Sequence, residues 1–379
     1  MIYLIRIADC PNVAAQNRLS AFINGFNALG LNYRLVFIQP THSLDKSSNL
    51  NAKKIYLWKA KRTGIKWIDY TLYQLWAKLF CKVTLNLFCR NLKKGDIIVD
   101  FSATDFLHKF VKCKDIKVFA ERTEHPEVVC RPKTEKLMSQ YIEDCKKLAG
   151  IFVISTSLKS YFKSIGVSED KIHIINMVVD PNRFINLRKQ EIKERYIAYC
   201  GTASNSKDGV DDLIRSFAIV SKQIPDIKLY IIGKIPNKKE AHDNLNLINE
   251  LGIKDKVVLT GIISSSKMPQ LLKNAECLVL ARPDSIQAEN GFPTKLGEYL
   301  LTKNPVVITR TGDIPKFLED GVSALICEPQ NCEEIAQKIC WVLNNKSAAS
   351  KIGENGYNVA LKSFNSIIES KKIYDVLVN

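Results

Sequence analysis

One stretch of the chain, residues 281–309, constrains the fold more than any other part of the sequence. It has the sequence ARPDSIQAENGFPTKLGEYLLTKNPVVIT and follows the apolar run CLVL at 277–280. The apolar runs at 277–280 and 306–308 are typical of buried strands. Between them, apolar side chains spaced three and four residues apart predict a helix over 294–302. The stretch is therefore predicted to form a strand, a loop, a short helix and a second strand.

The start of this predicted helix carries groups that suit a bound phosphate. Pro293 fits the first turn, where no N–H partner is lost, and Gly291 lets the backbone approach a ligand closely. The free N–H groups and the positive end of the helix dipole favour an anion such as pyrophosphate. Lys295 adds a positive charge and Thr294 a hydroxyl. One turn further on, the Glu298 carboxylate can accept hydrogen bonds from two neighbouring hydroxyls, as in a ribose. The pattern indicates a nucleotide-sugar pocket.

The segment NGFPTKLGEYLLTKNPVV resembles the donor-site signature of retaining glycosyltransferases of family 4. The resemblance implies an α/β protein with the GT-B fold, in which two Rossmann-like domains face each other across a cleft. The signature usually has two glutamates. Glu298 matches the second, which contacts the ribose, whereas Asn290 stands at the place of the first, with Glu289 one position away. The donor-binding residues that the resemblance implies in this segment are Ser285, Asn290, Gly291, Phe292, Pro293, Thr294, Lys295 and Leu296.

The chain has 379 residues, enough for two domains with separate cores. A strand at 2–7, a helix to about residue 29 and a strand at 33–38 predict a Rossmann-like opening. Residues 176–184 are similar to the interdomain linker of the family. We therefore place an acceptor-binding domain at 1–185, a nucleotide-sugar-binding domain at 186–362, and a C-terminal helix at 363–379 that crosses back onto the first domain.

The loop that follows the first strand of the second domain, GTASNSKDG, carries further donor candidates. Family members usually have a glycine, an arginine and a lysine here, and both cations face the donor diphosphate. Gly201 matches the glycine and Lys207 the lysine, whereas Thr202 replaces the arginine. An exposed loop lysine is the alternative for Lys207. Gly233 ends another predicted strand, at a junction over the same cleft.

Arg282 is the candidate that replaces the missing arginine. It follows the end of a predicted strand and lies beside the helix start at Pro293. The alternative is a structural ion pair between Arg282 and Asp284.

The loop after the first strand, DCPNVAAQN, has no glycine, although GT-B enzymes usually carry a glycine-rich loop there. Its polar side chains Asn12, Gln16 and Asn17 are candidates for the acceptor side of the cleft. The alternative, which is equally favoured, is that they only cap the following helix.

A second cluster of polar residues, ERTEHPE at 121–127, follows the predicted strand 117–120. Open α/β sheets bind their ligands at the carboxyl ends of strands. His125 could donate to a hydroxyl or phosphate, and Glu124 or Glu121 could orient an acceptor sugar. We assign His125 and Glu124 to the catalytic set, together with Lys207 and Glu298, and Glu121 to the acceptor side. The alternative is a turn with surface charges.

The chain carries a net charge of +16, and much of this positive charge is concentrated in residues 53–94. Eleven Lys or Arg stand there against one acid, Asp69, and the window also holds four tyrosines or tryptophans within the predicted helix 65–92. An apolar stripe predicts either a core-facing helix with a solvated basic face or a peripheral contact with an anionic membrane. Nucleic acid is disfavoured, because no recognition motif accompanies the charge. The stripe consists of Ile68, Leu72, Leu75, Leu79 and Val83.

Several classes of site are disfavoured by the sequence. The eleven cysteines include no C-x-x-C pair, which favours a reduced cytosol over disulfides or zinc. No 18-residue stretch lacks charge, and the N-terminus is not typical of a secretory signal. No D-x-D metal motif stands in a suitable loop, so we expect no required metal and no cofactor. The other histidines, which show no partner in the sequence, are His42, His108, His173 and His242.

The sequence therefore predicts a cytoplasmic retaining glycosyltransferase of hexosyltransferase type, metal-independent and peripheral on the inner face of the membrane. Its partners would be a nucleotide sugar and a glycan or polyprenyl-linked acceptor, as in surface polysaccharide biosynthesis. Two alternatives stay open. One is a GT-B nucleotide-sugar epimerase, which would need acids and bases for proton transfer at carbon. The other is a non-catalytic protein that binds membranes or polyanions on the same fold.

Overall fold

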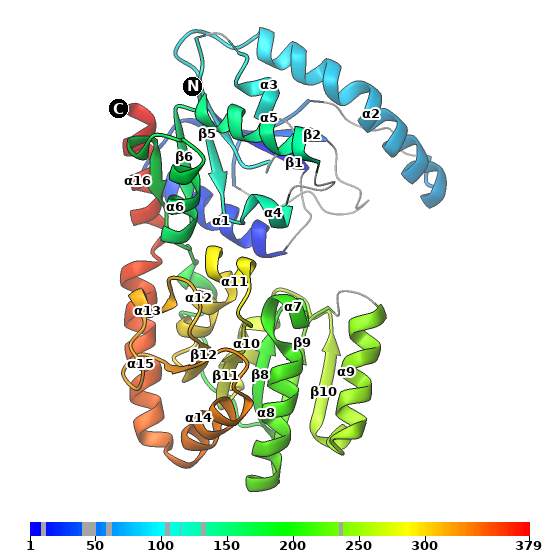
Figure 1. The fold of residues 1–379 in the computed structure, drawn as a ribbon, viewed down its shortest axis with the longest axis vertical. Coiled ribbons are helices and arrows are strands. Elements are labelled where there is room, and N and C mark those ends of the chain that lie inside the picture. The colour runs from blue at the N-terminus through cyan, green and yellow to red at the C-terminus, as the bar shows by residue number, and fades with distance from the viewer. Residues whose placement is uncertain are drawn as a thin grey trace. The chain divides into compact units, whose positions relative to one another are not determined.

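The computed structural model describes residues 1–8, 13–39, 51–57, 63–102, 107–113, 115–129, 134–234 and 238–379. The chain forms two compact units, of which the first comprises Met1–Asn176 and Ser366–Asn379 and the second Met177–Asn365 (Figure 1). The sequence places the boundary at 185 and the returning segment at 363. In the structure the chain leaves the first unit after Asn176 and returns at Ser366.

The first unit contains a seven-stranded sheet whose neighbouring strands all pair in parallel. The strand order is β3-β2-β1-β4-β5-β6-β7, so the order reverses next to β1. Ligands of open α/β sheets bind at such a reversal, outside the carboxyl ends of the strands. The strands are β1 (Ile2–Ala8), β2 (Tyr33–Gln39), β3 (Lys54–Tyr56), β4 (Ile97–Asp100), β5 (Lys117–Arg122), β6 (Gly150–Val153) and β7 (Ile172–Ile174).

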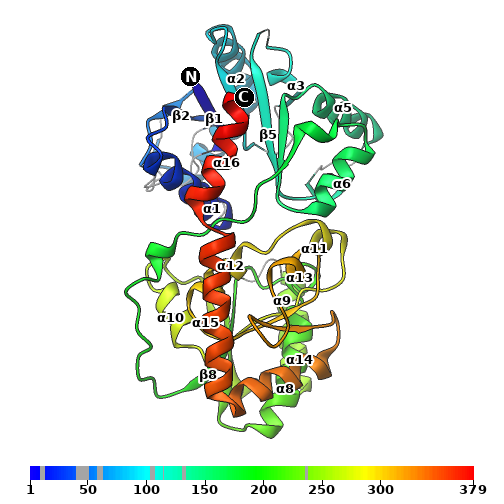
Figure 2. The ribbon, with the colours of Figure 1, turned by 90° about the vertical axis from the view of Figure 1, so that its left-hand side faces the viewer.

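Helices pack against this sheet through apolar stripes. The apolar stripe of the first helix is buried, with Phe22 and Ile23 fully inaccessible and Leu19 and Phe26 each 3% exposed. The last helix lies beside that first helix (Figure 2), and Ser370 Oγ donates to the Phe22 carbonyl at 3.3 Å. A Cβ at Gly25 would lie 2.2 Å from Ser370 Oγ, so only glycine allows this close contact. The helices are α1 (Val13–Ala28), α2 (Lys66–Arg90), α3 (Leu107–Phe110), α4 (Pro126–Val129), α5 (Glu135–Lys146), α6 (Thr156–Ser164) and α16 (Ser366–Val378).

The second unit contains a six-stranded sheet, again with parallel neighbours, in the order β10-β9-β8-β11-β12-β13. Every residue of β11 and β12 is buried, which explains their uninterrupted apolar sequences. The strands are β8 (Arg195–Cys200), β9 (Ile227–Ile232), β10 (Val257–Gly261), β11 (Cys277–Leu280), β12 (Val306–Thr309) and β13 (Leu325–Cys327). The predicted order of strand, helix and strand in this stretch is confirmed by β11, α12 and β12, and the structure shows in addition that β11 and β12 are adjacent.

The helices of the second unit follow the predicted alternation, with added short helices. α7 and α11 have four and five residues, too short for a periodic apolar pattern to reveal. The helices are α7 (Asn205–Asp208), α8 (Val210–Gln223), α9 (Lys238–Glu250), α10 (Met268–Asn274), α11 (Ile286–Asn290), α12 (Thr294–Leu301), α13 (Ile314–Phe317), α14 (Cys332–Asn344) and α15 (Lys346–Ser363).

Helix α2 departs from the core-facing alternative. Leu75, Leu79 and Val83 of the predicted stripe are 52%, 65% and 54% exposed, whereas Cys81 and Leu85 are buried. The stripe therefore faces outward at these three positions, because other residues of α2 supply the contact with the core. Figure 1 shows the first half of α2 extending along the outside of its unit. None of the helices in the described part of the chain is long and apolar enough to cross a membrane.

Candidate functional site

Helix α12 begins as the sequence predicts, with Pro293 directly before its first residue. Leu296, Tyr299 and Leu300 are buried against the core, so the helix is held by its apolar face. A Cβ at Gly297 would lie 2.3 Å from a methyl group of Val179. The absence of a side chain at Gly297 therefore lets the helix pack closely against the segment that contains Val179. The first-turn side chains are thereby positioned at the carboxyl edge of β11.

The Lys295 ammonium lies in a buried polar cluster rather than in solvent. Its Nζ donates to Asp208 Oδ2 at 2.6 Å and to Tyr199 Oη at 3.0 Å. The Lys295 side chain is 17% exposed and that of Asp208 3%. Burial lowers the pKa of Lys295 from its ordinary value, and the Asp208 carboxylate opposes that change. Glycine suits position 201 because φ there is 152°, a conformation that L side chains rarely adopt, and a Cβ would also lie 2.6 Å from the same nitrogen.

Glu298, the predicted ribose ligand, forms an ion pair with Arg183. Arg183 ends the short 3₁₀ helix Pro181–Arg183, and both side chains are partly buried. A carboxylate offers about four lone-pair positions, so an arginine and a diol can share it. The sequence places this arginine only within the linker, and no sequence signal relates it to Glu298, which is 115 positions away.

The loops after β8 and β9 contact each other through glycines. Gly233 has a φ of 132°, and a Cβ there would lie 2.0 Å from the Gly201 carbonyl oxygen. Beside them lies a hollow of about 300 Å³, lined by Ile231, Gly233, Lys234, Leu259, Gly261 and Ile262. Its mainly apolar walls suit a planar ring system.

The predicted cation Arg282 is 2% exposed, and its guanidinium donates to the carbonyl oxygens of Gln287 and Ala288 in α11 at 3.2 and 3.5 Å. It therefore supports the loop before α12. Lys207 lies on α7, half-buried, next to Asp208, and Thr202 is exposed. Sequence reasoning missed Asp208, although an acid directly after a predicted diphosphate ligand was the available signal.

Other predicted donor residues have structural contacts. Ser285 caps α11, because its hydroxyl accepts from the Ala288 N–H at 3.1 Å. Asn290 Nδ2 donates to the Ile286 carbonyl oxygen at 2.9 Å. Glu289 accepts from the Gly312 N–H at 3.0 Å. Phe292 is 7% exposed and packs in an aromatic cluster. The side chains of Phe292 and Leu296 therefore serve packing. For Phe292, only the backbone is available to a ligand near the start of α12.

In the first unit, Glu121 forms an ion pair with Arg18 at 2.8 Å, and Arg18 also donates to the Asn176 carbonyl oxygen at 3.1 Å. His125 is buried, accepts from the Glu127 N–H at 3.3 Å and packs edge-on against Tyr161. Glu121 is thus held by an arginine at the end of β5, while His125 is fixed by packing.

The remaining candidates of the first unit are the catalytic candidate Glu124, after β5, and three acceptor-side residues. Asn17 and Glu124 are half-buried. Asn12 lies outside the described residues, and of Gln16 only the backbone, in α1, is described. A buried cluster that the sequence missed joins Arg122 to Asp100 at 3.0 Å and to Tyr141.

His108, for which the sequence shows no partner, has one in the structure. Its Nδ1 lies 3.1 Å from both carboxylate oxygens of the buried Asp144 on α5. His242 contacts Asn246, and burial lowers the pKa of His173. His42 lies outside the described residues. Within the part of the chain that the structure describes, no group of three or more metal-ligating side chains is found.

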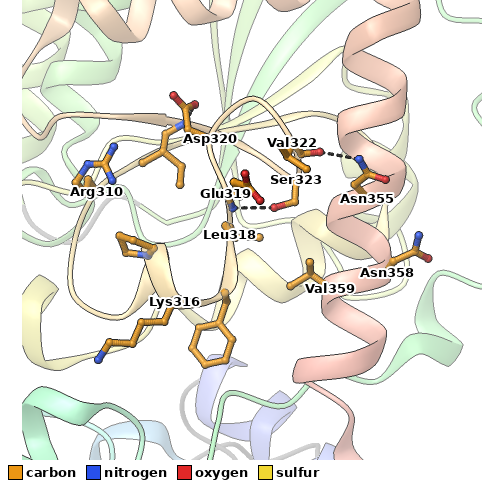
Figure 3. Close-up of a pocket in the computed structure, with 13 residues that line it drawn as sticks. Arg310, Lys316, Leu318, Glu319, Asp320, Val322, Ser323, Asn355, Asn358 and Val359 are labelled. Atoms are coloured by element: carbon orange, nitrogen blue, oxygen red, sulfur yellow. Dashed lines mark hydrogen bonds between the residues drawn. The ribbon is translucent and has the colours of Figure 1, made fainter.

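A larger hollow of about 650 Å³ lies elsewhere in the second unit, between the segment after β12 and α15 (Figure 3). None of the predicted site residues lines it. Three of its four charged side chains have ion-pair partners, since Arg310 pairs with Glu328, Lys316 with Asp313, and Asp320 with Lys338. We therefore place the candidate site at α12 and not in this hollow.

Comparison with known proteins finds a family match within the second unit. Residues 182–359 match the family model described as glycosyl transferases group 1. The chain is 25% identical over 175 residues to alpha-D-kanosaminyltransferase of Streptomyces kanamyceticus, a match that covers 44% of this chain and 43% of the relative. The chain spans about half the length of the curated relatives that it matches.

Solved structures resemble the whole chain. Anabaena HepE in complex with UDP has a TM-score of 0.74 at 15% identity, covering 100% of this chain and 99% of that one. WaaG, a glycosyltransferase involved in lipopolysaccharide biosynthesis, has a TM-score of 0.70 at 14% identity and covers 100% of both chains. The two parallel-sheet α/β domains thus have the GT-B fold, as the sequence predicts.

Proposed function

We propose that this protein is a retaining glycosyltransferase that moves a hexosyl group from a nucleotide sugar to a glycan or lipid-linked acceptor, in surface polysaccharide biosynthesis. One observation carries the proposal: the buried Lys295 ammonium and the Glu298 carboxylate lie one turn apart at the start of α12. The match to glycosyl transferases group 1 supports it. So do the UDP bound to HepE and the role of WaaG in lipopolysaccharide biosynthesis.

In this proposal the second unit holds the donor. Lys295, Lys207 and the N–H groups at the start of α12 stabilise negative charge as it grows on the departing nucleoside diphosphate. Glu298 accepts hydrogen bonds from the ribose, and the hollow beside Gly233 takes the base. Lys295, Lys207 and the start of α12 supply the positive charge that the reaction needs, so we propose a metal-independent transfer. The acceptor hydroxyl attacks from the side of the leaving group, which retains the configuration of the sugar.

The first experiment compares donor alone with donor plus acceptor. Purified protein is incubated with UDP-glucose, UDP-N-acetylglucosamine or GDP-mannose, with and without a polyprenyl-diphosphate-linked sugar, and nucleotide release is measured. Release that requires the acceptor supports transfer. An epimerised donor without release would instead establish the epimerase alternative. Binding of vesicles without binding of any nucleotide would establish the non-catalytic one.

Glu298→Gln is expected to raise the KM for the donor by about 10- to 100-fold, because a hydrogen bond to a charged group contributes about 1.5–3 kcal/mol. The matched control is Glu289→Gln, which alters a carboxylate that accepts from the Gly312 N–H instead. Steady-state kinetics with varied donor provide the measurement. Equal KM values for the two variants would remove the ribose contact from the proposal. Melting temperatures show whether loss of the Arg183 ion pair unfolds the variant.

We also propose that α2 binds the enzyme peripherally to the anionic inner face of the cytoplasmic membrane. Exposed apolar side chains lie along α2 both within the predicted stripe, where Leu79 is 65% exposed, and outside it, at Trp67 (70%) and Tyr70 (59%). Lys82 and Arg90 are exposed near that stripe, and Asp69 is the one acid in the sequence of α2. Apolar and cationic groups on one exposed helix suit the boundary between headgroups and acyl chains.

The triple variant Leu75→Ser, Leu79→Ser and Val83→Ser is expected to reduce binding to vesicles containing phosphatidylglycerol by at least tenfold, because three buried apolar contacts with lipid are lost. Co-sedimentation measures this binding. Leu137→Ser on α5 is the control, since Leu137 is 53% exposed but lies outside the stripe. Equal binding of the triple variant and wild type would exclude α2 as the membrane contact.

A further inference from the structure

Asp208 lies at the centre of the polar cluster that holds Lys295. It is the last residue of α7 and directly precedes Gly209, whose left-handed backbone (φ 63°, ψ 42°) turns the chain into α8. The Asp208 carboxylate is buried and lies 2.6 Å from Lys295 Nζ and 2.7 Å from Tyr199 Oη. A buried carboxylate needs such partners, and here both belong to the candidate donor site.

Tyr199 restricts the cluster further. Its hydroxyl lies 2.6 Å from the Thr202 carbonyl oxygen and 2.7 Å from Asp208, and it accepts from Lys295. One hydroxyl proton serves one of the two acceptors at a time. Burial raises the pKa of Tyr199 well above its ordinary value, so the hydroxyl stays protonated. The ammonium is also 4.7 Å from the centre of the Tyr199 ring. Lys295 is thus held on two sides, by a carboxylate and by an aromatic ring.

We infer that Asp208 is a positioning residue of the donor site, which fixes the Lys295 ammonium, with Tyr199, where the diphosphate of a nucleotide sugar meets it. This inference rests on the proposed function. Asp208 contacts the lysine from the side of α7, while Lys295 projects from the first turn of α12. The Asp208 side chain is 3% exposed and that of Lys295 17%, so part of the lysine side chain remains accessible to a ligand.

The charge of Lys295 depends on this contact. The groups that face it are Asp208 and Lys207 from α7, Tyr199 from β8, Arg282 after β11 and Glu298 on its own helix. Burial and the two cations lower the pKa of Lys295, while Asp208 raises it. Without Asp208 the ammonium would lose its proton at a lower pH, and affinity for a nucleoside diphosphate would be lost as pH rises through that lower pKa.

The test measures binding of UDP and GDP by calorimetry from pH 6 to 10, with wild type, Asp208→Asn and Asp208→Glu. For Asp208→Asn we expect the high-pH loss of affinity to begin at least one pH unit lower, with binding at pH 9 at least tenfold weaker than in wild type. Asp208→Glu keeps the charge and should restore the wild-type pH profile. If Asp208 only stabilises the fold, the melting temperature falls while the pH profile stays unchanged, and the inference is overturned.

A second variant tests the inference if Asp208→Asn does not fold. Tyr199→Phe removes one acceptor of the lysine while leaving the carboxylate, and should move the profile in the same direction by a smaller amount. An unchanged profile in that variant would also overturn the inference. The readout needs no acceptor sugar: wild-type protein that binds UDP or GDP but transfers nothing refutes the proposed function alone, whereas wild type that binds neither nucleotide refutes both.

Discussion

Lys295→Met is expected to lower kcat/KM for the donor by about 100- to 1,000-fold, because it removes a positive group directed at the developing charge of the leaving diphosphate. It also leaves the Asp208 carboxylate buried without its counter-ion. Breaking a buried ion pair in this way costs about 3 kcal/mol or more, which corresponds to a fall of about 6–12 °C in melting temperature for a domain of this size. Steady-state kinetics and calorimetry provide the two measurements.

The double variant Lys295→Met with Asp208→Asn separates the two effects. Replacing both members of a buried pair removes the unpaired charge, so most of the lost stability should return. Donor turnover should stay as low as in the single variant, since the cation is still missing. A double variant that regains turnover along with stability would show that Lys295 serves the fold and not the leaving group.

Most of the architecture could be predicted because most strands of both sheets contain a short apolar run, and the runs of β11 and β12 are wholly buried. The adjacent pairing of β11 and β12 follows directly from the two apolar runs that flank α12. The surroundings of α2 were harder to predict from residues 66–90, because apolar periodicity shows only that one face of the helix is apolar. It does not show whether protein covers that face, and Leu75, Leu79 and Val83 proved exposed.

The candidate site was predictable only in part, for a similar reason. Backbone features such as the helix start at Pro293 follow from local sequence, and the structure contains them. Side-chain partners distant in the sequence do not follow. Asp208 and Lys295 are 87 positions apart, and Arg183 and Glu298 are 115 apart. The first contact depends on how α7 meets α12, and the second on how the 3₁₀ helix Pro181–Arg183 meets α12, which no short motif records.

Gly209→Ala is expected to destabilise the second unit by about 3 kcal/mol or more, combining two costs. The left-handed conformation, with φ of 63°, costs an alanine about 1–2 kcal/mol. In addition, its Cβ would lie 1.8 Å from the Ala281 carbonyl oxygen, a contact that only a shift of the backbone can relieve. Denaturant unfolding gives the free energy of unfolding, and UDP binding reports on the adjacent Asp208.

Gly252→Ala is the matched control, because Gly252 has nearly the same φ, 66°, and a Cβ added there would meet no atom within 4 Å beyond its chain neighbours. It should lose only about 1 kcal/mol from the left-handed backbone and keep its affinity for UDP. The difference between the two variants then measures the close contact of residue 209 with residue 281. If both variants lose the same free energy of unfolding, the contact of residue 209 with residue 281 adds no cost of its own. If Gly209→Ala alone loses UDP binding, the approach of α7 to the end of β11 is what sets the position of Asp208, and through it that of Lys295.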